Sequence, residues 1–314
     1  MSGITLICRS GTPFTADGKL DEQGLRGYLH RFIDARLGVN LASGGSGEGH
    51  ALSIAELKRV YEIGVEECKG KVPVFANPPE QHTVRATREQ TMLAVEAGVD
   101  VVNVYPPAAW HGMRPKDSEL VAYYDDLFGE IKYPIALSVN PVIGYLPDAA
   151  TIADVCQRYK QIAILNLFGV SDGYLVDVKD RIARDLPIHV PLRGSLNALA
   201  LGARGLVGAE ANVLPKTHRQ YIDLYEQKRT DEIGAVYAHI LRFKQFAARW
   251  EPANPRWIKM AMKVLKLPGG AGGVREPYRN PTPEDLRAFT DGLLKLGVPE
   301  IDEQARAAGL AVRR

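Results

Sequence analysis

Short apolar runs alternate with longer amphipathic segments along the first two thirds of the chain. Each run is almost continuously apolar rather than alternating, which is typical of parallel strands covered on both faces. The segments between the runs carry helix signals, such as the Ser53 and Glu56 pair of a capping box. A strand followed by a helix, repeated eight times, predicts an α/β fold, the (β/α)8 TIM barrel. The expected strands cover residues 4–8, 38–43, 72–77, 100–105, 134–139, 162–168, 188–193 and 205–211.

The strand signal stops after Asn212, and the remaining chain has a helical pattern. Apolar residues recur three and four positions apart in YIDLYEQKR, AVYAHILRFKQFAARW and RWIKMAMKVLKL. Thr282 followed by Pro283 predicts the start of another helix. We therefore expect two parts, a barrel over residues 1–213 and a C-terminal helical extension over residues 214–314.

The amino-acid composition excludes several classes of protein and is consistent with the predicted fold. The 314 residues are 46% hydrophobic and 24% charged, which excludes a disordered or collagen-like chain. A net charge of +2 without a dense basic stretch argues against nucleic-acid binding. No apolar run is long enough for a membrane span, and MSGITLICRS is too short in its apolar part for a signal peptide. Three unevenly spaced cysteines fit a reducing compartment, so we expect a cytoplasmic protein without membrane partners.

Candidate chemistry is expected where the strands end, because the loops after parallel barrel strands form the active sites of this architecture. None of these strand ends carries a lysine. The polar residues that they do carry are Arg9 after the first strand, Ser43 to His50 after the second, Ser138 and Asn140 after the fifth, Asn166 in the sixth, Arg193 after the seventh, and Glu210 after the eighth.

The glycine-rich turn over residues 44–49 is the most specific local signal. Successive glycines let backbone N–H groups converge on an anion, and Gly45 and Ser46 lie at its centre. The alternative is a tight turn that binds nothing. Sequence alone leaves both interpretations open.

Arg9 and Arg193 each allow two interpretations, one as a ligand-binding residue and one as a structural residue. A guanidinium that points into the barrel mouth is a permanent, bidentate partner for a carboxylate or phosphate. Alternatively, each arginine pairs with a carboxylate of the protein itself. Glu210 is a candidate general base, or else a buried residue paired for structural reasons.

The loops after the second to fourth strands add Glu48, His50, His82 and His111. A histidine or glutamate there suits proton transfer near neutral pH. The spacing of the four follows no metal motif, so we expect no metal and no cofactor. Trp110, in the loop after the fourth strand, is a candidate cover for a ligand.

Several motifs together resemble the dihydrodipicolinate synthase and N-acetylneuraminate lyase superfamily. They are TPF at 12–14, DGKLD at 17–21, GGSGEG at 44–49, KVPVFA at 71–76, EAGVDVVNVYPP at 96–107, ALSVNPVIG at 136–144, LALGARGLVGAEANVLP at 199–215 and KLPGG at 266–270. The resemblance implies a (β/α)8 barrel with a helical extension, assembled as a dimer or tetramer. It also implies cleavage or formation of C–C bonds of 2-oxo acids through a Schiff base on a strand-six lysine.

The catalytic residues of that family are replaced at the corresponding positions of this sequence. Its GTTGE motif corresponds to GGSGE here, which leaves Ser46 as the one hydroxyl beside Gly45. Asn166 stands where the family has its lysine, and Ser138 where it has the tyrosine of a YNVP-like motif. The tyrosine pair after strand four is replaced by residues 106–109, PPAA. An amide cannot form an iminium, because the covalent step needs a free amine.

The leading hypothesis is therefore a lyase-like protein that binds a small carboxylate or 2-oxo acid without a lysine Schiff base. Asn166, Ser138 and Glu210 are its candidate catalytic residues; its candidate binding residues are Gly45, Ser46, Arg9, Arg193 and Asn140. One alternative is a non-catalytic binding or scaffold protein on the same fold. Another is a conventional pyruvate-type aldolase whose lysine lies elsewhere in the chain.

Overall fold

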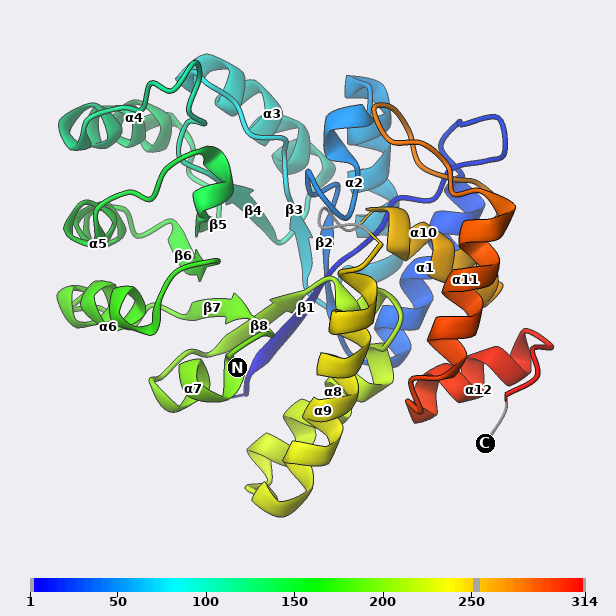
Figure 1. The fold of residues 1–314 in the computed structure, drawn as a ribbon. Coiled ribbons are helices and arrows are strands. Elements are labelled where there is room, and N and C mark those ends of the chain that lie inside the picture. Colours follow the sequence, from blue (N-terminus) through cyan, green and yellow to red (C-terminus); the bar gives the residue numbers. More distant parts are fainter. Residues whose placement is uncertain (1–2, 251–254, 313–314) are drawn as a thin grey trace.

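Eight parallel strands close into a barrel in the order of the sequence, so the predicted TIM barrel is confirmed. The computed structural model describes residues 3–250 and 255–312. β1 pairs with β8 and closes the ring (Figure 1). The strands are β1 (Thr5–Arg9), β2 (Gly38–Leu41), β3 (Val74–Ala76), β4 (Val101–Val104), β5 (Ile135–Val139), β6 (Ile162–Leu167), β7 (Ile188–Pro191) and β8 (Gly205–Gly208).

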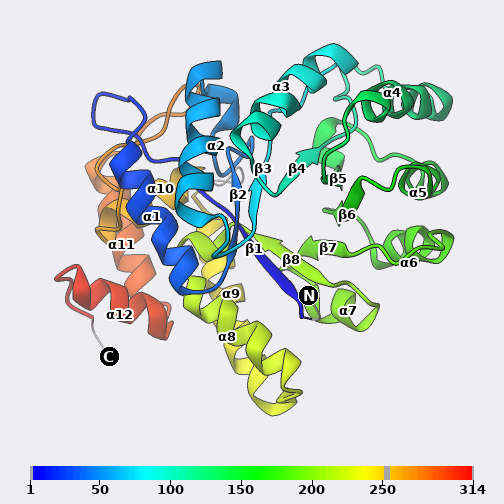
Figure 2. The same cartoon turned by 180° about the vertical axis from the view of Figure 1, so that it is seen from behind.

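A layer of helices surrounds the strands, as the rear view also shows (Figure 2). Each strand is followed by one helix, and the Ser53 capping box predicted from the sequence starts α2. The helices are α1 (Glu22–Asp34), α2 (Ile54–Cys68), α3 (Val84–Ala97), α4 (Asp117–Glu130), α5 (Ala149–Arg158), α6 (Asp172–Arg181), α7 (Ser195–Ala200) and α8 (Pro215–Glu226).

In the described part of the chain four further helices follow, and α10 to α12 lie beside α1 in both views (Figures 1 and 2). α8 contacts β1 as well as α9, so it completes the helical layer of the barrel. If α8 is counted with the barrel, the extension begins at α9 rather than at residue 214. The four helices are α9 (Thr230–Ala247), α10 (Pro255–Val264), α11 (Pro283–Leu294) and α12 (Pro299–Ala307).

The core has two parts, one between the strands and the helices and a smaller one inside the barrel. The inner part contains Ile7, Phe75, Ala136, Phe168 and Val207, all buried. Ile7, Phe75 and Ala136 are each followed two positions later by a polar residue nearer the carboxyl end of the strand, namely Arg9, Asn77 and Ser138. Apolar packing therefore fills the lower barrel, and Phe168, just past β6, lies at the polar end, where binding or catalysis is expected.

The cysteines and the helices bear on what composition led us to expect. Cys8, Cys68 and Cys156 are buried free thiols. Over residues 3–250 and 255–312, no helix combines the length and the apolar character that a bilayer span requires.

Candidate functional site

A chain of buried asparagines crosses the carboxyl end of the barrel. The Nδ2 group of Asn166 donates to Ser138 Oγ at 2.9 Å and to Asn103 Oδ1 at 3.0 Å. The Nδ2 group of Asn103 in turn donates to Asn40 Oδ1 at 3.0 Å and to Asn77 Oδ1 at 3.4 Å. These side chains come from neighbouring strands and share one side of the sheet, so two predicted residues, Asn166 and Ser138, do lie together.

This network leaves an acceptor unused. Both N–H groups of Asn166 are committed, and its Oδ1 is buried with no hydrogen-bond partner among the described residues. A buried unpaired carbonyl costs about 1–3 kcal/mol. The network therefore offers a ligand a hydrogen-bond acceptor, and it offers no nucleophilic amine at this position.

Tyr105 and Glu80 lie beside this network, and both were missed as site residues from the sequence. Burial raises the pKa of Tyr105, and the charge of Glu80 adds to this, whereas Arg9 and a hydrogen bond with Ser138 lower it. Burial likewise raises the pKa of Glu80, while hydrogen bonding to its own backbone and the charge of His50 oppose the rise. Glu80, Tyr105 and Asn103 line one small cavity. Tyr105 is the last residue of the expected strand 100–105, which was a usable signal, but Glu80 lies in a proline-rich loop that no pattern distinguishes.

Arg9 is the last residue of β1 and pairs in register with Asn40. Residues in register on parallel strands share a face of the sheet. The side chain is half-buried, and its Nε has no hydrogen-bond partner within the part of the chain that the structure describes. An unpaired guanidinium at the polar end of the barrel is available to an anion.

The glycine-rich turn after β2 folds tightly against the strand that precedes it. A Cβ on Gly47 would lie 2.7 Å from Ser43 N, and one on Gly49 would meet Ala42 closer still. The N–H groups of Gly47, Glu48 and Gly49 donate to Ser43 or Gly45 carbonyls within the turn. The Ser46 hydroxyl is buried and has no partner among residues 3–250 and 255–312. The tight-turn interpretation thus accounts for Gly47 and Gly49, and Ser46 has a hydroxyl that the turn itself does not use.

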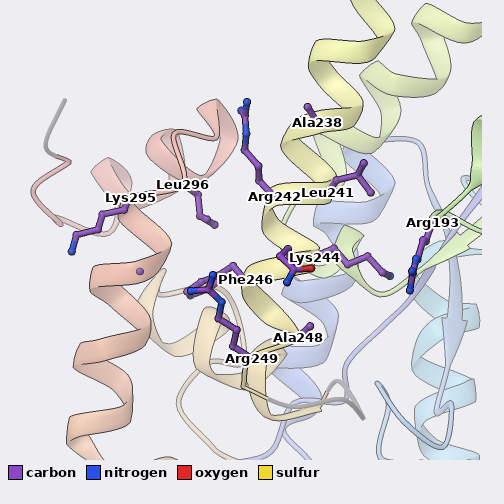
Figure 3. Close-up of a pocket in the computed structure, with 12 residues that line it drawn as sticks. Arg193, Ala238, Leu241, Arg242, Lys244, Phe246, Ala248, Arg249, Lys295 and Leu296 are labelled. Atoms are coloured by element: carbon purple, nitrogen blue, oxygen red, sulfur yellow. The ribbon is translucent and has the colours of Figure 1, made fainter.

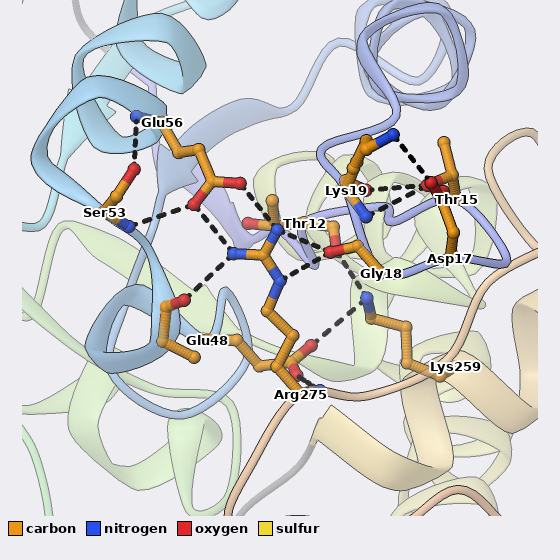
Figure 4. A network of polar contacts seen from close by, with 11 residues as sticks. Thr12, Thr15, Asp17, Gly18, Lys19, Glu48, Ser53, Glu56, Lys259 and Arg275 are labelled. Carbon is orange, nitrogen blue, oxygen red and sulfur yellow. Dashed lines mark hydrogen bonds and ion pairs between the residues drawn. The ribbon is translucent and has the colours of Figure 1, made fainter.

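Glu48 belongs to a charged cluster that ties the extension to the barrel rim (Figure 4). Its carboxylate lies 3.1 Å from Lys259 Nζ, with both side chains almost fully buried. Its other oxygen accepts from the Arg275 backbone N–H at 2.8 Å. Arg275 also donates two hydrogen bonds to Glu56, at 2.6 and 2.8 Å. We call Glu48, Glu56, Lys259 and Arg275 the rim clamp; its carboxylates are engaged in structure rather than facing a ligand.

Glu210 is also paired. Its carboxylate accepts from Lys244 of α9. Burial works to raise the pKa of Glu210, but the Lys244 ammonium outweighs this and holds the pKa below its usual value. Burial lowers the pKa of the neighbouring His218 to about 4, so this histidine is neutral at physiological pH. A general base at Glu210 would have to act while bonded to Lys244.

The remaining sequence candidates lie further from the network. Asn140 accepts from Val142 N at 3.2 Å and so caps a short 3₁₀ turn. Arg193 is exposed at the end of β7. His50 bonds to Gly44 O at 2.9 Å, whereas His82 makes an edge-to-face contact with Trp110, with ring centres 5.0 Å apart. Among the residues described, no three or more histidines, cysteines or acidic groups are placed to hold a metal.

Comparison with known proteins agrees with this architecture. A model of the dihydrodipicolinate synthetase family matches residues 4–295. A 4-hydroxy-tetrahydrodipicolinate synthase of Methanopyrus kandleri is 27% identical over 91% of this chain and 94% of its own length. An N-acetylneuraminate lyase of Actinobacillus pleuropneumoniae is 30% identical over 71% of this chain and 75% of its own.

Solved structures show the same fold. A putative dihydrodipicolinate synthetase from Pseudomonas aeruginosa superposes with a TM-score of 0.84 at 21% identity, covering 96% of this chain and 100% of that one. A prophage protein of the dihydrodipicolinic acid synthase family from E. coli, in complex with pyruvate, gives 0.84 at 20% identity, covering 95% and 100%. With the family match running from β1 to the C-terminal helices, the chain belongs to the dihydrodipicolinate synthetase family.

Proposed function

We propose that this protein binds a small carboxylate or 2-oxo acid at the carboxyl end of the barrel and acts on it as a lyase without a lysine Schiff base. The observation that carries the proposal is a set of buried polar atoms that lack partners among the described residues: Arg9 Nε, Ser46 Oγ and Asn166 Oδ1. Buried polar groups are normally satisfied, so three such atoms at one end of a barrel favour the binding of a polar ligand there. The relative solved with pyruvate makes a 2-oxo acid the first ligand to try.

Each group has a chemical role in this proposal. Arg9 and Ser46, with the neighbouring Gly45 amide, donate to the carboxylate of the ligand. The Oδ1 of Asn166 accepts from a hydroxyl or hydrated carbonyl next to that carboxylate, while Ser138 fixes the amide. Arg193 and Asn140 remain candidates for contacts with the far end of the substrate.

Proton transfer is the step that needs an acid or a base. Glu80 and Tyr105 line the same small cavity, and burial raises the pKa of both. A carboxyl with a raised pKa transfers protons more readily near neutral pH. Glu210 is the competing base, although its bond to Lys244 makes it less accessible to a substrate. We favour Glu80 for this reason.

The conventional aldolase mechanism is tested directly by reductive trapping. The protein is incubated with pyruvate and borohydride, and its intact mass is measured. We expect no adduct, because the buried Lys259 is held by Glu48 and the half-buried Lys244 by Glu210. An adduct on the unmodified chain would overturn the proposal, and peptide mapping would identify the lysine used.

The variant Asn166→Lys is the positive control for trapping. It places an amine in register with Ser138, where the family has its catalytic lysine. If a 2-oxo acid binds at this end of the barrel, the variant should form a borohydride-stable adduct. A folded variant that excludes pyruvate would argue against the proposed ligand class.

Turnover separates an enzyme from a non-catalytic binding protein. A panel of 2-oxo and hydroxy acids is screened by thermal shift, and each stabilising compound is then followed for conversion. Conversion that is lost in Glu80→Gln supports the lyase. Stabilisation without conversion across the panel favours the binding protein, the second candidate function.

We also propose that the protein is cytoplasmic and self-associates as a dimer or tetramer. Trp110 and Met113, after β4, are exposed, as are Val142 and Leu146, after β5. The two loops are joined by a hydrogen bond from Ala109 N to Ile143 O at 2.7 Å. Trp110→Glu with Met113→Lys should shift the mass measured by light scattering towards the monomer; an unchanged mass would remove these loops from the interface.

A further inference from the structure

A basic pocket lies outside the barrel, between the end of β7, the face of α9 and the end of α11 (Figure 3). Its volume is about 890 Å³, within the range of small-molecule sites. Among the described residues, the charged groups that line it are all positive: Arg193, Arg242, Lys244, Arg249 and Lys295. No aspartate or glutamate within the ranges 3–250 and 255–312 lines it.

Most of these cations are unpaired. Lys244 bonds to Glu210, and in Figure 3 its side chain extends towards Arg193. The side chains of Arg193, Arg242, Arg249 and Lys295 make no hydrogen bond or ion pair with any residue in the ranges 3–250 and 255–312. Elsewhere on the surface, arginines such as Arg26, Arg59 and Arg229 each pair with glutamates. The pocket therefore concentrates positive charge that the described part of the chain does not neutralise.

The walls of the pocket are apolar. Leu241, Phe246 and Leu296 line it together with small residues of α9 and α11. A bound anion reduces the repulsion between neighbouring lysines and arginines. An arginine binds phosphate or carboxylate groups through paired N–H donors. Apolar walls add affinity for a ring or chain attached to those groups.

We propose that this pocket binds a phosphorylated small molecule with at least two negative charges and an apolar or aromatic part. This site is separate from the proposed carboxylate site, which lies inside the barrel. The two sites adjoin at Arg193, a candidate contact for the far end of the barrel substrate, and at Lys244, whose partner Glu210 lies just after β8.

The test is calorimetric titration of the full chain at fixed ionic strength, with ADP, inorganic pyrophosphate and adenosine as probes. We expect saturable binding of ADP, weaker binding of pyrophosphate, which lacks the ring, and none of adenosine, which lacks the charge. The double variant Arg242→Gln with Arg249→Gln should weaken ADP binding by about 100-fold, since a hydrogen bond to a charged group contributes about a factor of ten or more.

Arg287→Gln is the matched control. Arg287 is an exposed arginine of α11 that does not line the pocket, so its variant should bind ADP like the unmodified chain. Arg9→Met should also leave ADP binding intact, so failure of the barrel proposal would not affect this result. Absence of saturable ADP binding, or equal weakening in the control and the double variant, would overturn the proposal.

Discussion

The rim clamp and the asparagine network lie at the same end of the barrel but differ in how completely they are satisfied. In the clamp, Glu48 has Lys259 and the Arg275 amide, and Glu56 has both N–H groups of one guanidinium edge. In the network, Asn166 Oδ1 has no partner among the described residues, and the same holds for Arg9 Nε nearby. The charged groups thus maintain the shape of the rim, while uncharged amides and one free arginine are left for a ligand. Formal charge is therefore a poor guide to function here, and unmet hydrogen-bonding capacity is a better one.

The clamp should show the largest loss of stability when it is broken. Lys259→Met leaves Glu48 buried without its cation, so we expect the free energy of unfolding to fall by about 3–5 kcal/mol. Urea denaturation measures this. Lys263→Met, on the exposed side of α10, is the control and should change the free energy by less than about 0.5 kcal/mol. If Lys259→Met and Lys263→Met lowered the free energy of unfolding equally, the buried ion pair would not stabilise the fold more than an exposed lysine does.

The network should be the next most sensitive region. Asn103→Ala removes the residue that bridges Asn166 to Asn40 and Asn77, so each of these three amides loses one hydrogen bond. We expect a loss of about 2–3 kcal/mol in denaturant unfolding. Asn197→Ala, at an exposed position of α7, supplies the control. A loss below 1 kcal/mol would mean that water replaces the bridge without cost.

The Glu56 part of the clamp should respond to pH. Hydrogen bonding to Arg275 lowers the pKa of Glu56 from 4.5 to about 2. Because the folded-state pKa is depressed, this stabilisation is complete above pH 4.5 and is lost as the pH falls towards 2. Glu56→Gln keeps the capping box of α2 but removes the charge. We expect it to be less stable by about 1–2 kcal/mol at pH 7 and to converge with the unmodified chain near pH 2. If the difference in free energy of unfolding between Glu56→Gln and the unmodified chain stayed the same from pH 7 to pH 2, the contribution of the ion pair would be contradicted.

Arg9 should give the smallest effect on stability and the clearest effect on binding. Because its Nε has no partner in the described part of the chain, Arg9→Met should change the free energy of unfolding by less than about 1 kcal/mol. The same variant should lose the thermal stabilisation that a carboxylate ligand gives the unmodified chain. Arg9→Lys keeps the charge and should retain part of it. A large loss of stability in Arg9→Met without ligand would make Arg9 a structural residue like those of the clamp.

The sequence predicted the barrel because each strand is an uninterrupted apolar run and each helix has its own start signals. It also predicted that Ser138 and Asn166 lie at strand ends, which the register of β5 and β6 brings together. It did not reveal that Lys259 meets Glu48, because partners this far apart leave no periodic signal in the chain. Glu80 was missed for a different reason: its character comes from burial beside Tyr105, which depends on how the loops pack.

The rim clamp has a consequence for the order of folding during synthesis. Glu48 precedes Arg275 by 227 residues, so almost the whole barrel leaves the ribosome before its rim has its counter-charges. Until α10 and the loop after it are synthesised, the Glu48 carboxylate has to stay hydrated, which keeps the turn after β2 open. The last fifth of the chain therefore stabilises the closed form of an N-terminal turn, and a ribosome that stalls before Lys259 should leave a nascent barrel open to proteolysis at residues 43–49.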